Sequence, residues 1–419
     1  MMHTICLKKH QHITIFWQKR ANNEIIRRQT IFVLHLWSAN MFSIILLTLI
    51  QSFTMKATKI LTTSLILVCS LAANAKKSEL SDFEKDEMRK GISYYDDNKP
   101  DIAIDIYNNL LANNPKSYII NYELALAKVA KGEYAEALKI TQKIEHNADV
   151  EDKLFQLQGN VYDYMGNRKK AVASYNKGLK KFPKAGCLYM EKGNIMLMEN
   201  NPNGALGMYE KAIEVEPTYS SPYYRASALF LGSTEPIWGF IYGETFLLLE
   251  KGQRNVAIQD AMVKRMGQAF KIENDTTLHV SLTQQHTINM KGLNLIIPFE
   301  MLYELTILKS SAVDKLKSEK RDSITISDFI EIRKTAANAY DDWKDKYPNY
   351  LFEYQKRLID AGYFEAYTMD LFKDVYADEY KAYIANEENQ KTMEAYKAWM
   401  VKCPFEPNEN KLIIRKEAQ

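Results

Sequence analysis

Histidines are the first residues to consider, because imidazole binds metal ions and transfers protons near neutral pH. Three lie after residue 75: His146, His279 and His286. On a strand, His279 and His286 would point to opposite faces, and on a helix they would lie about 10 Å apart along the axis. One Zn²⁺ ion needs its ligands within about 2 Å of the metal. This spacing predicts no metal site.

The other reactive side chains form no recognisable catalytic motif. Cys187 and Cys403, the cysteines after residue 75, lie in distant segments and are compatible with a disulfide or with two free thiols. The sequence has no HExxH, no GxSxG and no glycine-rich phosphate loop. Adjacent acids such as Asp341 and Asp342 diverge on a helix, which is typical of solvated surface and not of an acid–base pair. We therefore predict no catalytic residues and no cofactor.

Aromatic residues crowd the C-terminal part of the chain. Tyr376, Tyr380 and Tyr383 would share one face of a helix. A ring stripe of this kind forms a platform for sugar rings or, more commonly, packs between helices. The aromatic residues concerned are Trp343, Tyr347, Tyr350, Phe352, Tyr354, Tyr363, Phe364, Tyr367, Phe372, Tyr376, Tyr380, Tyr383, Tyr396 and Trp399.

Net charge excludes one class of partner. The whole chain carries a formal charge of +3, but residues 1–75 hold eight Lys and Arg against the single acid Glu24. Residues 76–419 therefore hold 55 − 8 = 47 basic and 52 − 1 = 51 acidic residues, a charge of about −4. A chain of this balance, with no basic stripe, is not expected to bind nucleic acid.

The N-terminus predicts export. Residues 55–75, MKATKILTTSLILVCSLAANA, have the order of a secretory signal peptide, with cleavage expected after Ala75. We interpret residues 1–54 as an upstream extension from a start codon placed too early. The alternative is a membrane anchor, because residues 31–50 are 20 largely apolar residues, enough to cross a bilayer. The expected location is the periplasm or the outer membrane, with membrane contact only through these segments.

An internal repeat specifies the elements that would position a binding surface. Blocks of 34 residues begin at Glu84, Tyr118, Asp152, Gly186 and Ser220. Places 8 and 20 of every block are small, and place 24 is Tyr in three of the first four blocks. The residues at place 8 are Gly91, Ala125, Gly159, Gly193 and Ser227, those at place 20 are Ala103, Ala137, Ala171, Ala205 and Gly239, and those at place 24 are Tyr107, Thr141, Tyr175, Tyr209 and Gly243.

This spacing predicts two amphipathic helices per block. Turns are expected near Asn98, Gly132, Gly166 and Asn200, and prolines follow three of the second helices. The small residues let the two helices approach, and the tyrosine fills the space toward the next pair. One helix pair cannot bury its apolar face alone, so neighbouring pairs must stack.

The pattern resembles the tetratricopeptide repeat, which implies an all-α solenoid over residues 84–253. Its repeats would be residues 84–117, 118–151, 152–185 and 186–219, and a degenerate fifth copy, residues 220–253, where the superhelix bends or ends. The segment AGYFEAYTMDLF also resembles a motif of uncharacterised exported repeat proteins of Bacteroidetes-type bacteria.

A mostly helical C-terminal region, residues 254–403, is expected to follow, with a tail at residues 404–419. Helices are predicted near residues 298–317, 326–346, 349–360, 363–384 and 388–402, with caps at Ser327 and Asn349. Residues 276–289 alternate apolar and polar side chains and predict one hairpin or an irregular connector.

The resemblance implies that the first helix of each pair lines a concave groove. The groove-lining residues would be Ile92, Tyr95, Tyr122, Leu126, Val129, Asn160, Tyr164, Met190, Leu197 and Tyr224. A groove this apolar is filled by the protein's own C-terminal half, or it binds a segment of another protein. The clamp with which chaperone-type repeats hold a peptide carboxylate is not expected, because Met88, Glu123 and Leu157 occupy the corresponding places.

We therefore expect an exported, non-catalytic scaffold of the bacterial envelope that binds a protein or peptide partner through this groove. The alternative is a glycan-binding or enzymatic C-terminal module for which the repeats are a docking arm. The sequence leaves the partner's identity and the oligomeric state open.

Overall fold

A computed structural model describes residues 80–273, 278–284, 289–291, 294–321 and 323–415 of the chain. The predicted signal peptide and the possible anchor at residues 31–50 lie outside these ranges. Within them, no helix has the length and apolar character needed to cross a membrane.

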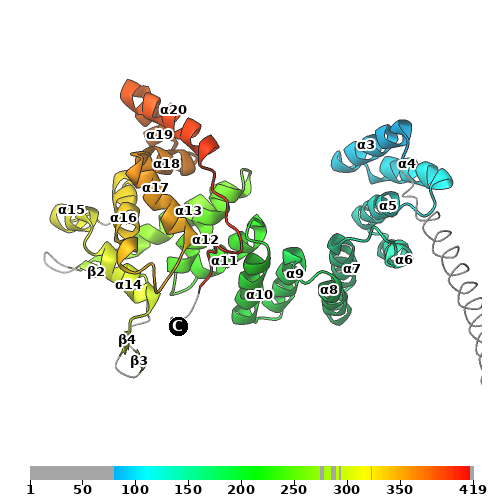
Figure 1. The fold of residues 1–419 in the computed structure, drawn as a ribbon, viewed down its shortest axis with the longest axis horizontal. Coiled ribbons are helices and arrows are strands. Elements are labelled where there is room, and N and C mark those ends of the chain that lie inside the picture. Colours follow the sequence, from blue (N-terminus) through cyan, green and yellow to red (C-terminus); the bar gives the residue numbers. More distant parts are fainter. Residues whose placement is uncertain (1–79, 274–277, 285–288, 292–293, 322, 416–419) are drawn as a thin grey trace, which may run out of the picture. The chain divides into compact units, whose positions relative to one another are not determined.

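Residues 82–249 fold into five antiparallel helix pairs (Figure 1). The pairs are α3 Asp82–Asp96 with α4 Pro100–Asn113, α5 Tyr118–Ala130 with α6 Tyr134–Ile144, α7 Asp152–Tyr164 with α8 Arg168–Lys181, α9 Gly186–Met198 with α10 Pro202–Val215, and α11 Ser220–Leu231 with α12 Ile237–Leu249. From α5 onward, the first helices begin at the block starts that the repeat predicted. The all-α fold with helical hairpins is therefore as expected.

The turns inside the first four pairs are also where the sequence placed them. Asn98, Gly132, Gly166 and Asn200 have positive φ angles of 59°, 78°, 74° and 59°. Glycine adopts this left-handed conformation at little cost, and asparagine tolerates it better than most residues. The residue type at these positions therefore ends each first helix and reverses the chain.

Close packing within each pair explains the small residues at place 8. In three repeats, a Cβ atom on the glycine would lie 3.0 Å or less from the ring of the tyrosine at place 24. These pairs are Gly91 with Tyr107, Gly159 with Tyr175, and Gly193 with Tyr209. The second repeat has Ala125 and Thr141 at the same places, both fully buried, and the fifth has Ser227 and Gly243. A larger residue at one place is matched by a smaller one at the other.

The fifth pair joins the repeats to the C-terminal helices. Residues 237–247 of α12 are buried on every side, as expected for a helix that is apolar all round. Trp238 packs against the Phe299 ring at 5.1 Å, and its indole N–H donates to Glu300 Oε1 at 2.8 Å. The degenerate repeat is thus part of the core that continues into the C-terminal region.

The C-terminal region is mostly helical, with two short hairpins. The strands β1 Phe270–Ile272 and β2 Leu278–Val280 pair antiparallel with Phe270 opposite Val280, and β3 Asn289–Lys291 and β4 Asn294–Ile296 pair with Asn289 opposite Ile296. The helices are α13 Arg254–Gln268, α14 Phe299–Ile307, α15 Ser311–Glu319, α16 Ile326–Asn338, a 3₁₀ turn Ala339–Asp342, α17 Tyr350–Asp360, α18 Phe364–Leu371, α19 Ala377–Ala385 and α20 Glu387–Lys402.

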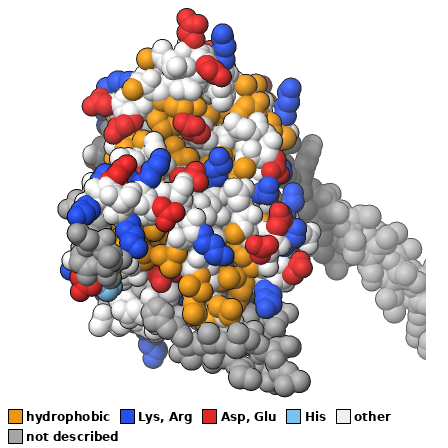
Figure 2. Space-filling model, turned by 90° about the vertical axis from the view of Figure 1, so that its left-hand side faces the viewer, with side chains coloured by type: hydrophobic (Ala, Val, Ile, Leu, Met, Phe, Trp, Pro, Cys, Tyr) orange, Lys and Arg blue, Asp and Glu red, His pale blue; other side chains and the backbone are white. Residues whose placement is uncertain are grey.

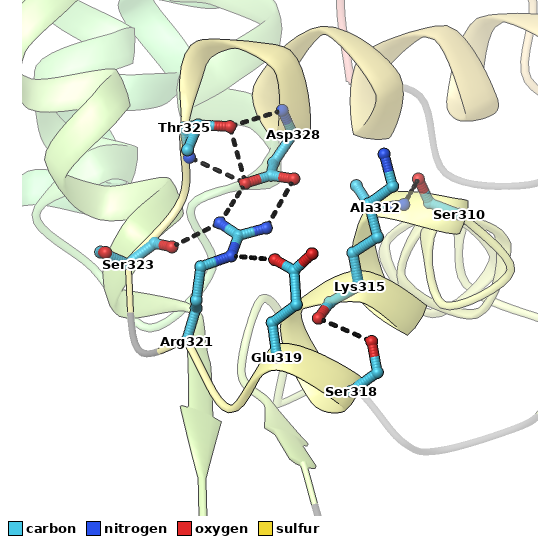
Figure 3. Close-up of polar contacts among 9 residues, drawn as sticks. All are labelled: Ser310, Ala312, Lys315, Ser318, Glu319, Arg321, Ser323, Thr325 and Asp328. Atoms are coloured by element: carbon cyan, nitrogen blue, oxygen red, sulfur yellow. Dashed lines mark hydrogen bonds and ion pairs between the residues drawn. The ribbon is translucent and has the colours of Figure 1, made fainter.

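Two segments that were each predicted to form one helix form two helices in the structure. The predicted helix 298–317 breaks after α14, where Ser310 caps α15 by accepting a hydrogen bond from the Ala312 N–H at 3.3 Å (Figure 3). The predicted helix 363–384 breaks between α18 and α19. Fully buried Phe372 lies in this break and packs edge-on against Phe329 at 4.9 Å. A tertiary contact therefore accompanies a break that local helix propensity does not indicate.

The cap of α16 was predicted at the wrong residue. Thr325, and not Ser327, is the N-cap, because Thr325 Oγ1 accepts from the Asp328 N–H while the Asp328 carboxylate accepts from the Thr325 N–H at 2.9 Å (Figure 3). Arg321 also donates to both Asp328 oxygens, at 2.6 and 3.1 Å. The cap predicted at Asn349 is confirmed, since its side chain accepts from the Leu351 N–H at 3.0 Å.

Most of the aromatic residues of this region form its core. Phe352, for example, contacts the rings of Tyr340, Trp343 and Phe299. The buried rings are Trp343, Tyr347, Tyr350, Phe352, Tyr354, Phe364, Tyr367, Phe372 and Tyr396. Packing between helices, the more common interpretation of such a pattern, accounts for these residues.

A buried polar network links α12 to three C-terminal helices. The Glu244 carboxylate accepts hydrogen bonds from the guanidinium of Arg333 (α16), the amide of Gln355 (α17) and the hydroxyl of Tyr367 (α18). Arg333 also donates to Thr368 Oγ1 at 2.7 Å. Burial and the neighbouring Glu244 raise the pKa of Tyr367 far above its ordinary value. The tyrosine therefore stays protonated and donates to the carboxylate.

The segment predicted as a tail is packed over residues 404–415. Phe405 stacks on Tyr350 at 5.2 Å, and Ile413 is fully buried. Farther along, the Arg415 N–H donates to the Tyr242 hydroxyl at 3.1 Å, and its guanidinium donates to Glu210 at 3.3 Å. This segment therefore reaches back to the second helices of the fourth and fifth repeats.

Figure 2 shows the face of the C-terminal helices that lies at the left of Figure 1. Lys and Arg side chains are interspersed with Asp and Glu side chains, and hydrophobic side chains gather in patches between them. Interspersed charges of both signs keep a surface soluble but do not single out a charged ligand.

Candidate partner-binding groove

The ten predicted groove residues lie on the first helices of the five pairs. They are Ile92 and Tyr95 on α3, Tyr122, Leu126 and Val129 on α5, Asn160 and Tyr164 on α7, Met190 and Leu197 on α9, and Tyr224 on α11. Tyr164 is the most open, with 58% of its surface exposed, and Met190 is the most covered, with 9% exposed. The other eight are half-buried.

An apolar strip follows the inner places of the repeats. Ile119, Tyr164 and Met198, on α5, α7 and α9, are 43%, 58% and 49% exposed. Between them, Tyr122, Leu126 and Val129 pack against the buried cluster formed by Ala125, Ala137, Leu138, Leu157 and Val161. We call this surface, from Tyr95 to Met198, the inner strip.

The packing around Leu126 is local. Among the described residues, the hydrophobic cluster that Leu126 packs against lies in the second and third repeats and extends no farther than Tyr162. Tyr134 of α6 adds to this surface, because its ring lies 5.7 Å from that of Tyr164. Tyr134 was missing from the sequence-based set, since it lies on a second helix.

The inner strip is closed at its far end. The Tyr219 hydroxyl lies 3.1 Å from Met190 Sδ, and the Tyr224 ring packs on Phe246 at 5.2 Å and under the Arg254 guanidinium at 5.1 Å. Tyr219 is the last residue of the fourth repeat, Phe246 belongs to the fifth, and Arg254 lies on α13. Met190 and Tyr224 therefore lie in or beside the core, whereas Tyr164 is accessible.

In the third and fourth repeats, the tyrosine at place 24 packs over the glycine at place 8, and its hydroxyl bonds to an asparagine of the first helix. Tyr175 donates to Asn160 Oδ1 at 2.6 Å, and Tyr209 donates to Asn194 Oδ1 at 2.9 Å. The first repeat has Ile92 at the place of these asparagines. Consequently the Tyr107 hydroxyl, although buried, makes no hydrogen bond to any described residue.

Carboxylates accompany the tyrosines of the inner strip. Burial raises the pKa of Glu123, and the Asp96 carboxylate raises it further, while Lys153 opposes both effects. Partial burial raises the pKa of Tyr164, and the Glu191 and Asp163 carboxylates add to that rise. At the level of sequence, Glu123 indicates only that a carboxylate clamp is absent. Asp96, Asp163 and Glu191 are not among the predicted groove residues.

Neutral groups hold Glu191. Its two oxygens accept from the Gln156 amide and the Asn194 amide, each at 2.9 Å. Asp163 lies 3.6 Å from the Arg168 guanidinium. The amides fix the position of the Glu191 carboxylate without cancelling its charge.

Reactive side chains are few near the inner strip. Cys187 and Cys403 are free thiols, and burial raises the pKa of Cys187 to about 12, helped by nearby Asp152. A thiol that stays protonated is a poor nucleophile and a poor metal ligand. His279 pairs with Glu273 at 2.7 Å on the surface, and His286 lies outside the described residues. Within the described ranges, no group of three His, Cys, Asp or Glu side chains could hold a metal ion.

Comparison with known families bears on the repeats directly. A model of the tetratricopeptide repeat matches residues 88–149, which run from α3 to the loop after α6. The protein carries tetratricopeptide repeats. Within the matched range, each tetratricopeptide repeat has the small residue at place 8 and the alanine at place 20 that the packing requires. No curated protein matches the chain.

Solved structures of tetratricopeptide repeat proteins show partial similarity. A tetratricopeptide repeat protein of the thermophile Thermus thermophilus is 15% identical and has a TM-score of 0.37, covering 43% of this chain and 98% of its own. The pilF protein of Pseudomonas aeruginosa is 14% identical with a TM-score of 0.37, covering 43% and 82%. MamA is 16% identical with a TM-score of 0.31, covering 38% and 92%.

Proposed function

We propose that this protein is a non-catalytic scaffold whose tetratricopeptide repeats bind a segment of another polypeptide along the inner strip. The observation that carries the proposal is the exposure of Ile119, Tyr164 and Met198 on three successive first helices. Burying apolar surface contributes about 25 cal/mol per Å², from which the cost of ordering the bound segment is subtracted. Tyrosine and methionine suit such a surface, since both adapt to an irregular partner.

We also propose that the protein acts outside the cytoplasm, in the periplasm or at the outer membrane. The support is the signal-peptide pattern of residues 55–75. N-terminal sequencing of the native protein tests it. A first residue of Lys76 is expected, and a mature protein that retains residues 31–50 would instead indicate the membrane anchor.

Photo-crosslinking tests the scaffold proposal. A photoreactive amino acid replaces Tyr164 in the full chain, and the matched control replaces Lys139 of α6, whose side chain is 72% exposed. We expect crosslinks to one partner at position 164 and none at position 139. The variant Y122A/L126A should abolish the crosslink while helicity measured by circular dichroism is unchanged. Equal crosslinking from both positions, or crosslinking that survives Y122A/L126A, would remove the inner strip from the proposal.

The glycan-binding alternative has weaker support. It depended on the aromatic residues after Trp343, and most of those rings are buried in the C-terminal core. Rings that pack on one another present no face to a sugar. We therefore propose no glycan site in this region.

A further inference from the structure

We propose that the inner strip selects a cationic segment, one that carries Lys or Arg side chains between apolar residues. This inference rests on the proposed function and adds the chemical class of the partner. The apolar side chains of the strip would bind the apolar residues of the segment, and the carboxylates beside them would bind its cations.

The first group of acids lies beside Tyr107. Asp96 lies on α3 and Glu123 on α5, and both carboxylates add to the rise that burial causes in the pKa of Tyr107. Neither Asp96 nor Glu123 makes a hydrogen bond or an ion pair with any residue that the structure describes. The Tyr107 hydroxyl is buried and equally without a partner. Asp96 is exposed and Glu123 is half-buried, so both carboxylates remain free to pair with a cation of a bound segment.

The second group lies around Tyr164. Glu191 and Asp163 both act on its phenol, and Tyr164 is 58% exposed. Glu191 is positioned by two neutral amides, Gln156 and Asn194, which hold a carboxylate ready for a cation without an ion pair of its own. A cation over the Tyr164 ring would gain from the ring face as well as from the carboxylates.

Both groups lie on the first helices that carry the inner strip, Asp96 and Glu123 on α3 and α5, and Asp163 and Glu191 on α7 and α9. Lys153 acts on Glu123, and Arg168 lies 3.6 Å from Asp163, whereas neither Asp96 nor Glu191 forms an ion pair with any described residue. Complementary charge favours association and rejects partners of like charge.

Two designed peptides test the inference on the full-length protein. One is an amphipathic helix of leucine, alanine and lysine, and the other replaces every lysine with glutamate. Fluorescence anisotropy measures the dissociation constant Kd of each. We expect the lysine peptide to bind at least about tenfold more tightly, with an affinity that falls between about 50 and about 200 mM salt, because exposed charges are screened.

Two double variants separate the acids of the inner strip from acids elsewhere. E123Q/E191Q keeps the shape of both side chains and should weaken the lysine peptide by about tenfold. The matched control E136Q/E214Q removes two charges from α6 and α10, where the acids already pair with Lys139 and Lys211, and should leave Kd unchanged. Circular dichroism verifies that both variants are folded.

Other results of these experiments would distinguish failure of the charge preference from failure of the proposed scaffold function. If both peptides bind equally and only Y122A/L126A abolishes binding, the inner strip is a docking surface without charge preference, and the inference is wrong. If neither peptide binds, the inference is also wrong. If light scattering shows a dimer that Y122A/L126A dissociates, the occupant is a second copy. If the photoreactive residue at position 164 crosslinks to no partner in the otherwise unchanged protein, the proposed function itself is wrong.

Discussion

The repeats and the C-terminal helices are both helical, but they are stabilised by contacts of different range. In the repeats, Tyr175 donates a hydrogen bond to Asn160 at a sequence separation of 15, and Gln156 donates one to Glu191 at a separation of 35. In the C-terminal core, Glu244 meets Arg333, Gln355 and Tyr367 at separations of 89, 111 and 123 residues. A stack of local units can leave one face open for a partner, whereas a core built from distant segments must close on itself.

The largest expected effect comes from breaking the polar network of the C-terminal core. Arg333→Ala would leave the Glu244 carboxylate buried without a cation, which costs about 3–5 kcal/mol of unfolding free energy. Urea denaturation measures this loss. Asp360→Ala, which removes a surface partner of Lys356, is the control and should cost no more than about 0.5 kcal/mol.

Hydrogen exchange on Arg333→Ala sharpens the comparison between the two regions. Protection should fall in α12 and in α16–α18, which share the network, and stay unchanged in α5–α8, whose contacts are local. Equal loss of protection in both regions would show that the repeats and the C-terminal core unfold as one unit.

A smaller loss is expected from the segment that packs back onto the repeats. Ile413→Ala removes a fully buried side chain and should cost about 2–4 kcal/mol, measured by the same denaturation experiment. Val401→Ala is the control, because Val401 is 84% exposed and its truncation should change stability by less than about 0.5 kcal/mol. Equal effects of the two changes would mean that residues 404–415 do not contribute to the core.

The smallest of the three effects tests the packing rule of the repeats. Gly159→Ala would force a methyl group against the Tyr175 ring and should cost about 1–3 kcal/mol. Adding Tyr175→Thr recreates the pairing of Ala125 with Thr141 and should recover part of the loss.

Gly207→Ala is the matched control for this packing test. Gly207 lies within α10, and a methyl group added there would meet no neighbouring side chain within 4 Å. The change should stabilise the protein by about 0.5–1 kcal/mol through helix propensity. A Gly159→Ala variant as stable as Gly207→Ala would contradict the proposed packing.

The two regions also differ in how much of them the sequence predicts. The helix starts at Tyr118, Asp152, Gly186 and Ser220 and the left-handed turns at Asn98 and its equivalents follow from residue types at fixed spacing. These features depend on short-range sterics, so the pattern is sufficient to place them.

The C-terminal region is harder to predict because its elements end for non-local reasons. The helix break at Phe372 accompanies its packing on Phe329. Thr325 is the cap of α16 where Ser327 is an equally good cap by residue type, and Asp328 together with Arg321 favours Thr325. The docking of Ile413 and Arg415 depends on surfaces far away in the sequence.

The candidate site shows the same division. The repeat places predict a set of inward-facing residues that includes exposed Tyr164, but they do not show that the Tyr219 hydroxyl lies against Met190. The sequence contains a signal for the unpartnered Tyr107 hydroxyl, because Ile92 occupies the place that asparagine holds in the third and fourth repeats. That signal has meaning only once the tyrosine–asparagine hydrogen bond is known. The positions of Glu123 and Glu191 relative to the tyrosines required the fold.

The contact between Arg415 and Tyr242 has a consequence for the biogenesis of the protein. The two residues are 173 apart in the sequence, so a ribosome adding about 5–20 residues per second needs about 9–35 s between them. Throughout that interval, the Tyr242 hydroxyl and the Glu210 carboxylate lack the contacts that Arg415 supplies. The last step in completing this end of the repeats is therefore the docking of residues 404–415.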